Sequence, residues 1–147
     1  HKKKYVWLAV LFGLLPDFLS FGIIFVINLV NGNFNRGPPA ISSLPEWLFA
    51  AYNLTHSIVM FIAVFFLIYL ITKHWFWPLT AWAAHIITDI PTHSTRFFPT
   101  PFLWPLSDYV FNGISWATPW FMVVNYSAIL IVFIVIAHNR AKGKRLK

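Results

Sequence analysis

Four long apolar stretches constrain this chain more than any other feature of its sequence. They cover residues 5–30, 45–71, 78–91 and 119–138. About 20 apolar residues in an α-helix cross the hydrocarbon core of a bilayer, and such a helix pairs its own backbone polar groups there. Only 10% of the residues are charged, whereas a soluble domain has about 25%. The sequence therefore predicts the all-α class, as an integral membrane bundle of four transmembrane helices in a single domain, residues 1–147.

Composition also excludes several kinds of chemistry. The chain contains no cysteine, which rules out disulfides, thiolate metal ligands and thiol nucleophiles. A net charge of +7 is of the kind seen in proteins that bind nucleic acids. The basic residues, however, lie at the chain ends and outside the apolar stretches. We therefore expect membrane lipids, and not nucleic acid, as partners of this protein.

The distribution of lysine and arginine predicts the orientation of the helices. If both chain ends face the cytoplasm, nine basic residues lie inside, in residues 2–4, at position 73 and in the basic tail 139–147. Only Arg36 and Arg96 then lie outside. This asymmetry follows the positive-inside rule. We therefore expect a multi-pass protein of a plasma membrane of the bacterial inner-membrane type, with both termini in the cytoplasm.

Prolines divide the predicted helices and indicate irregular backbone. Pro16 lacks the amide hydrogen that would bond to the carbonyl four residues earlier, which predicts a kink in the first helix. The second stretch is expected to form one continuous helix to about Ile71. Pro91 predicts the end of the third helix. Residues 92–108, rich in proline, are expected to form an irregular, re-entrant segment on the outer face, followed by a short helix over residues 109–116.

The third stretch contains a run in which polar groups recur at every fourth position, His85-Ile86-Ile87-Thr88-Asp89-Ile90-Pro91-Thr92-His93. Residues four apart lie on one face of a helix, so His85, Asp89 and His93 are predicted to form one column. Because Pro91 disturbs the helix, His93 is expected on a distorted last turn or just beyond it. Imidazole and carboxylate groups are ligands of zinc-type ions, and in an apolar setting they are costly unless paired or bound to an ion. The column therefore indicates a metal site.

Polar residues of two other helices lie at the same depth as this column. With a rise of 1.5 Å per residue, Asp17, His56 and Asp89 all fall in the middle to outer half of a bilayer core about 30 Å thick. The sequence therefore predicts that three helices bring ligands to one place. Taken singly, His56 could instead be a hydrogen-bonded packing residue. Asp17 could instead bond to a backbone group that Pro16 leaves free.

Four short motifs follow one another along the chain: Leu14-Leu15-Pro16-Asp17, Thr55-His56-Ser57, His85-x-x-x-Asp89-x-x-Thr92 and Leu103-Trp104-Pro105. Together they resemble the YdjM-like membrane-bound proteins, a family of metal-dependent hydrolases. The resemblance covers nearly the whole chain in order. It implies a four-helix membrane protein whose metal ligands are Asp17, His56, His85 and Asp89.

Two positions depart from the pattern of that family. Phe18-Leu19-Ser20 stands where many members have a second aspartate, and Asn53-Leu54 stands where many have an arginine. The first difference leaves open whether one or two metal ions bind. More loosely, H-x-x-x-D followed by Pro and His is similar to the helix motif of zinc-dependent phospholipase C and related nucleases. That similarity implies chemistry on phosphodiesters or phosphomonoesters, by analogy only.

These features predict a membrane-embedded hydrolase that uses one or two zinc ions to cleave a lipid or a lipid-linked ester, at phosphorus by the resemblance. The expected metal ligands are Asp17, His56, His85, Asp89 and His93. Asp108 is the expected catalytic acid or base. Arg96 is expected to bind a phosphate of the substrate, although it could equally be an interfacial residue that reaches the headgroups. Two other classes stay open: a metal-ion or proton transporter, and a non-catalytic membrane protein with a structural metal.

The apolar residues 97–104 are expected to border the path by which a lipid reaches this site. They are too apolar to cover a fully hydrated opening, and their prolines suit a fixed wall better than a mobile lid. We expect the segment to dip into the outer leaflet beside the ligands. The alternative is that it packs on the end of the bundle and leaves no opening.

Overall fold

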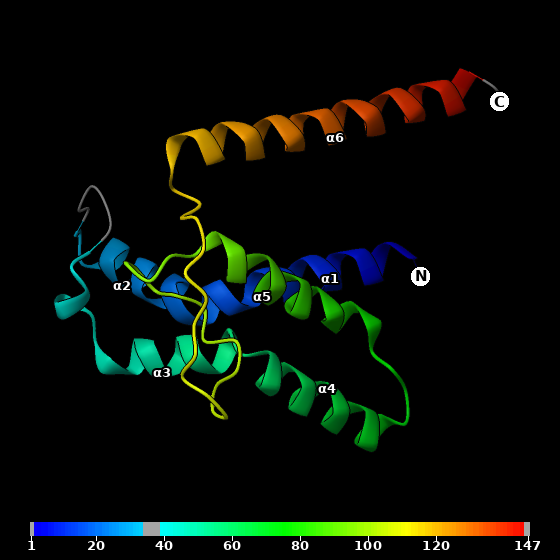
Figure 1. Ribbon diagram of the computed structural model, residues 1–147. Helices are drawn as coiled ribbons and strands as arrows, with labels where there is room; N and C mark the ends of the chain where they lie inside the picture. Colours follow the sequence, from blue (N-terminus) through cyan, green and yellow to red (C-terminus); the bar gives the residue numbers. More distant parts are fainter. Residues whose placement is uncertain (1, 34–38, 146–147) are drawn as a thin grey trace. The chain divides into compact units, whose positions relative to one another are not determined.

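The described chain is helical, with turns and irregular segments between the helices. The computed structural model describes residues 2–33 and 39–145, and these residues contain no strand. The all-helical class predicted from the sequence is therefore confirmed. The chain divides into two compact units, His1–Gly113 and Ile114–Lys147, and each is described by itself (Figure 1). A single bundle of four spans stays a prediction, and Arg36 lies outside the described residues.

The first membrane helix contains a π-helical turn. It consists of α1 (Lys2–Asp17), the π-helix η1 (Phe18–Gly22) and α2 (Ile23–Val30). The 28 residues Lys3–Val30 are long and apolar enough to cross a membrane. Where the sequence predicts a kink at Pro16, the structure has this wider turn directly after Asp17. The hydroxyl of Ser20 donates a hydrogen bond to the carbonyl oxygen of Pro16 (2.9 Å), which satisfies a backbone group at the altered turn.

The second predicted helix is broken, so the prediction of one continuous helix over residues 45–71 is wrong. After the 3₁₀ turn η2 (Ile41–Ser43), α3 (Glu46–Thr55) meets α4 (Ile58–Thr72) at an angle of 61°. Ser57 is extended and caps α4 by accepting a hydrogen bond from the amide of the third residue of that helix. The pair forms one broken span or a re-entrant loop.

Groups from elsewhere in the chain satisfy the backbone at this break. The amide of Ile58 donates to the carbonyl of Phe102 (3.0 Å). The indole N–H of Trp82 donates to the carbonyl of Thr55 (2.6 Å). Non-helical backbone at membrane depth is tolerated where protein groups replace the missing helical bonds. Sequence periodicity shows none of these distant partners, which is why it predicts an unbroken helix here.

The third predicted helix is shorter than a bilayer core is thick. A 3₁₀ turn, η3 (Trp77–Leu79), precedes α5 (Thr80–Thr92). The 13 residues of α5 extend about 20 Å at 1.5 Å per residue, against a core of about 30 Å. The helix ends directly after Pro91, as predicted, and His93 is its extended C-cap. The described residues therefore contain two helices that could each cross a membrane, or three if α3 and α4 form one span.

An irregular segment, residues 93–113, packs on α3 and on the break. Phe98 is buried against the ring of Tyr52, whose hydroxyl donates to the carbonyl of Phe98 (3.0 Å). The hydroxyl of Ser57 donates to the carbonyl of Trp104. Phe21 and Phe49 pack against the same buried cluster. The segment thus fixes the shape of the α3–α4 break from outside.

The end of this segment is tied to the end of α5. The amide of Gly113 donates to the carbonyl of His93 (2.8 Å), and the side-chain oxygen of Asn112 accepts two hydrogen bonds from Thr95. A Cβ atom at Gly113 would lie 2.3 Å from the carbonyl oxygen of Pro91, so only glycine fits this approach. The short helix predicted over residues 109–116 is wrong, because this stretch bonds to the end of α5 instead of to itself.

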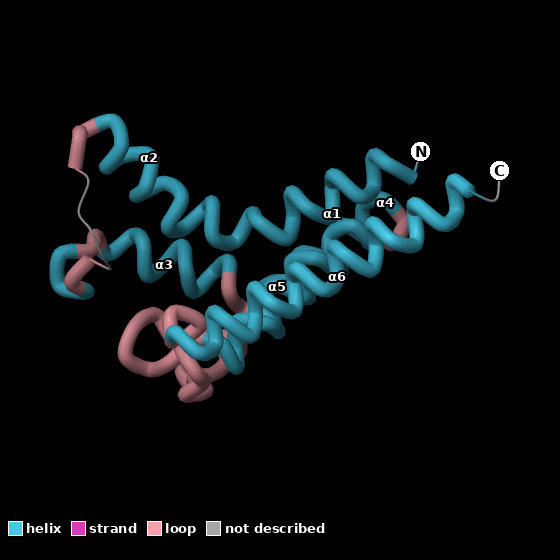
Figure 2. The backbone as a smooth tube through the Cα atoms, turned by 90° about the horizontal axis from the view of Figure 1, so that it is seen from above, coloured by secondary structure: helices cyan, strands magenta, loops and turns pink. Residues whose placement is uncertain are grey.

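The second unit consists mainly of one long helix. α6 (Pro119–Arg145) has 27 residues, and Pro119–Lys142 is long and apolar enough to cross a membrane. Figure 2 shows it as one unbroken helix. It continues past the predicted end near residue 138 into the basic tail, because arginine, alanine and lysine are strong helix formers. Together with Lys3–Val30, this helix gives the chain the spans of a membrane protein.

Candidate metal centre

His56 lies at the break between α3 and α4 and is fully buried. Its Nδ1 atom is 3.2 Å from the carbonyl oxygen of Tyr52 and 3.0 Å from the hydroxyl of Thr55. Because that hydroxyl donates to the carbonyl of Ala51 (2.8 Å), Nδ1 faces two acceptors, an arrangement that favours the tautomer with the proton on Nδ1. Nε2 then faces the other site residues with a free lone pair. Metal-binding imidazoles are commonly oriented by a hydrogen bond of this kind.

Tyr52 supports the ring of His56 in a second way. The two rings stack with centroids 3.9 Å apart and planes inclined by 22°. Tyr52 is itself held by its hydrogen bond to Phe98. The contacts with Tyr52 and Thr55 fix both the position and the orientation of His56.

Two carboxylates flank a pair of imidazoles. The Nε2 atoms of His56 and His85 lie 3.3 Å apart. On one side, Oδ1 of Asp17 is 3.4 Å from Nε2 of His56 and 3.8 Å from that of His85. On the other, Oδ2 of Asp89 is 3.2 Å from Nε2 of His85 and 3.5 Å from that of His56. α1, the α3–α4 break and α5 thus bring four ligand-type side chains together.

This donor set fits a divalent ion. A tetrahedral ion about 2.0–2.1 Å from each ligand holds its ligand atoms about 3.3 Å apart, close to the separations of the imidazole pair and its flanking oxygens. Asp17, His56 and His85 together could hold a metal ion, and Asp89 contacts both imidazoles. Among residues 3–33 and 39–142, whose side chains the structure describes, no lysine or arginine pairs with either carboxylate. A divalent cation would balance these two negative charges.

The cluster is closed on one side and open on the other. His56 is fully buried, and the side chains of His85 and Asp89 expose only 15% and 14% of their surface. The side chain of Asp17 exposes 61%. Structural zinc sites are closed by four protein ligands, whereas catalytic sites keep one position open. The exposure at Asp17 therefore resembles the arrangement of a catalytic site.

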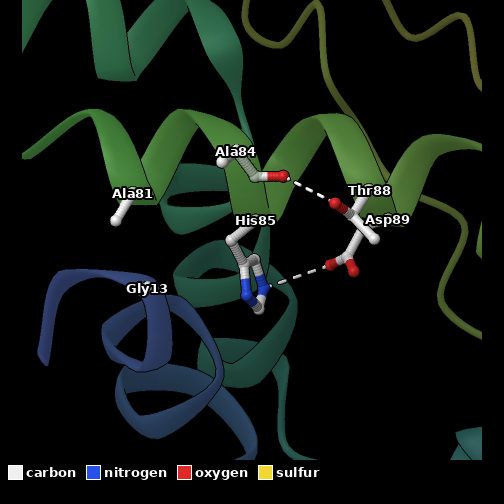
Figure 3. Close-up of a pocket in the computed structure, with 6 residues that line it drawn as sticks. All are labelled: Gly13, Ala81, Ala84, His85, Thr88 and Asp89. Atoms are coloured by element: carbon white, nitrogen blue, oxygen red, sulfur yellow. Dashed lines mark hydrogen bonds and ion pairs between the residues drawn. The ribbon is translucent and has the colours of Figure 1, made fainter. Parts of the chain in front are cut away.

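An open hollow of about 320 Å³ adjoins the cluster. It is lined by Gly13, Ala81, Ala84, His85, Thr88 and Asp89 (Figure 3). All six residues belong to α1 or α5. This opening beside the ligands therefore lies between these two helices. Residues 97–104 pack on α3 and on the break, and a lipid path along them stays a prediction.

His93 stays close to Asp89 although it leaves the helix. Its Nδ1 atom is 3.8 Å from Oδ1 of Asp89 and 3.2 Å from the backbone carbonyl oxygen of the same residue. His56 and His85 contact the other carboxylate oxygen, Oδ2. The predicted helical column is therefore regular for His85 and Asp89 only, because the helix ends just after Pro91.

Asp108 and Arg96 lie on irregular backbone after α5, and both are exposed. Within the part of the chain that the structure describes, neither forms an ion pair or a hydrogen bond with the four clustered residues. The structure thus brings together Asp17, His56, His85 and Asp89, with His93 beside them, and does not connect Asp108 or Arg96 to that group. The catalytic role of Asp108 and the phosphate-binding role of Arg96 stay predictions.

Sequence reasoning missed the small residues and the tyrosine around the cluster. Helical spacing was the available signal for each of them. Gly13 precedes Asp17 by four positions, and Tyr52 precedes His56 by four. Ala81 likewise precedes His85 by four positions. Each of these residues shares a helix face with the ligand that follows it.

The chain was compared with profiles of known protein families, with curated proteins and with solved structures, and none of the three comparisons finds a match. The resemblance to the YdjM-like proteins therefore rests on the four motifs and stays a prediction. What defines this site is its own geometry: Asp17, His56 and His85 could hold a metal ion, with Asp89 in contact with both imidazoles.

Proposed function

We propose that this protein is a membrane-embedded, metal-dependent hydrolase of a lipid or a lipid-linked ester, with the cleaved bond at phosphorus. One observation supports this most: the Nε2 atoms of His56 and His85 lie 3.3 Å apart between the carboxylates of Asp17 and Asp89, beside an open hollow. Two imidazoles and two carboxylates are ligand types of zinc hydrolases. Because Asp17 lies within a helix that is long and apolar enough to cross a membrane, a lipid is the substrate class that we propose.

Each residue of the cluster has a distinct task in this proposal. His56 and His85 would hold the metal as neutral imidazoles through Nε2 and Asp17 through one carboxylate oxygen, which leaves a fourth position open, and Asp89 would hold or bridge the ions if two are bound. Nδ1 of His93 lies 3.8 Å from Oδ1 of Asp89, the oxygen that faces away from the imidazole pair, and His93 would hold a second ion there if two are bound. When bound, a zinc-type ion supplies a Lewis acid that polarises an ester oxygen and activates water near neutral pH.

The surrounding residues keep this group in one arrangement. The carbonyl of Tyr52 holds a proton on Nδ1 of His56 and so leaves Nε2 as the ligand atom. The burial of His56 excludes water from the closed side, and the exposure of Asp17 leaves room for substrate on the open side. We propose Asp108 as the general acid or base and Arg96 as the phosphate-binding residue, both on the exposed backbone after α5.

We also propose a topology of four spans with both termini in the cytoplasm of a bacterial-type inner membrane. Lys3–Val30 and Pro119–Lys142 provide two crossings, and the bent pair α3–α4 provides a third. The 3₁₀ turn η3 and α5 provide the fourth. Single cysteines can be introduced at Lys3 and Lys142 because the chain has none of its own. Labelling of either position from outside intact cells would reject this topology.

Metal analysis and a lipid-hydrolysis screen of the purified full chain test the proposed activity. We expect one or two zinc ions per chain and release of a phosphorylated headgroup from bilayer lipids. His85→Ala should abolish both, whereas Asn125→Ala in α6 should change neither. Bound zinc without hydrolysis of any lipid would reject the hydrolase. Zinc or proton flux into proteoliposomes would then identify a transporter, and its absence would identify a structural metal site.

A further inference from the structure

The hollow beside the metal ligands is bordered by small side chains. Besides His85 and Asp89, its lining consists of Gly13, Ala81, Ala84 and Thr88. A Cβ atom added at Gly13 would lie 3.7 Å from the Cβ of Ala81, so α1 and α5 approach closely at this point. Ala84 and Thr88 are exposed at the opening. No bulky side chain of the lining closes the way to His85.

Apart from the two ligands, the hollow presents an uncharged and mostly apolar surface. The hydroxyl of Thr88 donates a hydrogen bond to the carbonyl of Ala84 (2.8 Å) and therefore has no proton left to donate to a ligand (Figure 3). The lining contains no lysine or arginine that could attract a charged group. Gly13 lies about 15 Å along the helix from Lys3, at 1.5 Å per residue, and is thus well inside the apolar span. The hollow therefore lies at the depth of the lipid chains.

We infer that this hollow binds the hydrocarbon chain of the lipid substrate next to the bond that is cleaved. The phosphoester lies at His85 and Asp89, and the first methylene groups of an acyl chain, which the glycerol links to it, lie against Ala81 and Ala84. A charged group in this place would lack a partner, whereas a hydrocarbon chain matches the wall. The chain enters sideways from the bilayer, between α1 and α5. Ala84, at the opening, is then a specificity-determining residue for chain bulk. This assignment rests on the proposed function for the identity of the reacting bond.

Filling the opening with a large side chain tests the assignment through binding alone. The zinc-loaded full chain is placed in vesicles of phosphatidylethanolamine and phosphatidylglycerol that contain a phosphatidylglycerol with a photoactivatable diazirine near the ester end of one chain. After illumination, mass spectrometry measures the label on residues 80–92 while unlabelled phosphatidylglycerol is added in excess. We expect labelling that the excess lipid displaces, and a decrease of about tenfold in Ala84→Trp.

A matched variant controls for the added tryptophan. Ile87 lies on the same helix, exposes 59% of its surface and does not line the hollow. Ile87→Trp should therefore keep the displaceable label. Zinc content is measured in every variant, and the smaller change Ala84→Leu replaces Ala84→Trp if the latter loses metal. Labelling that excess lipid does not displace, or that is equal in the Ala84 variant and the wild type, would overturn the assignment.

Hydrolysis, measured separately, distinguishes failure of this inference from failure of the proposed function. Displaceable labelling without hydrolysis of any lipid keeps the chain-binding hollow and rejects the hydrolase. Hydrolysis that falls equally for short-chain and long-chain phosphatidylglycerol in Ala84→Trp keeps the hydrolase and rejects the chain-binding role. Support for both requires a larger decrease for the long-chain substrate, with zinc content unchanged.

Discussion

Two helices among the described residues are long and apolar enough to cross a membrane, and they are similar in length and different in construction. Lys3–Val30 has 28 residues, and Pro119–Lys142 has 24. The first contains Pro16, Asp17 and a π-turn, whereas the second has no break and no charged residue before Arg140. A carboxylate at the centre of a membrane helix costs about 2.5–3.5 kcal/mol, so Asp17 needs the imidazoles beside it. The irregular turn of the first helix therefore lies at the candidate site. α6 is a helix of similar length that has neither an irregular turn nor a residue of that site.

The largest expected effect is loss of the metal when the partners of the first helix are removed. His85→Ala and Asp89→Ala should each abolish zinc retention, because each deletes a ligand and leaves the others unpaired. Mass-spectrometric metal analysis of the purified protein measures this. Asn125→Ala, a polar deletion in α6, should leave the zinc content unchanged. Full occupancy in Asp89→Ala would show that the cluster has been misread.

The next effect is a contrast between two aspartates. Ile131→Asp, in the exposed middle of α6, should raise the apparent free energy of membrane insertion by about 2.5–3.5 kcal/mol. A glycosylation reporter in microsomes measures that change. Asp17→Leu makes the first helix more apolar, yet it should lower the melting temperature of the folded protein, because His56 and His85 lose their partner. A higher melting temperature in Asp17→Leu would show that His56 and His85 do not compensate for the carboxylate of Asp17.

A smaller effect is expected at the contact that holds the end of α5. Gly113→Ala places a Cβ atom 2.3 Å from the carbonyl oxygen of Pro91, so the backbone must move, at a cost of about 1–3 kcal/mol. Zinc affinity should fall with it, because His93 and Asp89 lie at the same helix end. Thermal unfolding in detergent and zinc titration measure the two changes. Gly32→Ala is the control: it meets nothing within 4 Å, so only the cost of its positive φ remains, without loss of zinc affinity.

The smallest effect separates two serines. Ser20 is buried and donates to the carbonyl of Pro16 at the π-turn, whereas Ser127 is exposed on α6. Ser20→Ala should reduce the free energy of unfolding by about 0.5–1.5 kcal/mol, and Ser127→Ala by less than about 0.5 kcal/mol. Parallel thermal unfolding of the two variants checks this difference. Equal melting temperatures would mean that the hydroxyl of Ser20 does not stabilise the altered turn.

Part of the site could be predicted because depth in a membrane helix is a simple function of position. Counting residues places Asp17, His56 and Asp89 at one level, and the structure brings their side chains together with His85. The end of α5 could also be predicted from the sequence. Pro91 has no amide hydrogen, and this affects the helix only at its own position. The four-residue spacing that joins His85 to Asp89 follows from helix geometry alone.

The rest depends on contacts between distant parts of the chain. Nothing local in Thr55-His56-Ser57 requires a break, which exists because Phe102 and Trp82 supply hydrogen-bond partners. A short helix was predicted over residues 109–116, yet the carbonyl of His93 accepts a hydrogen bond from the amide of Gly113. Periodicity indicates how a segment would fold by itself. At both places, hydrogen bonds to residues far along the chain favour a different conformation.

The hydrogen bond from Ile58 to the carbonyl of Phe102 has a consequence for biosynthesis. The ribosome makes His56 well before Phe102, so the backbone that aims its imidazole lacks a partner until the later segment arrives. The second apolar stretch therefore lacks this partner while it is being made. The third element brings His85 and Asp89, and the segment after it closes the break. The ligand group is therefore held in its final arrangement only after most of the chain has been synthesised, and an incomplete chain exposes no finished metal-binding site.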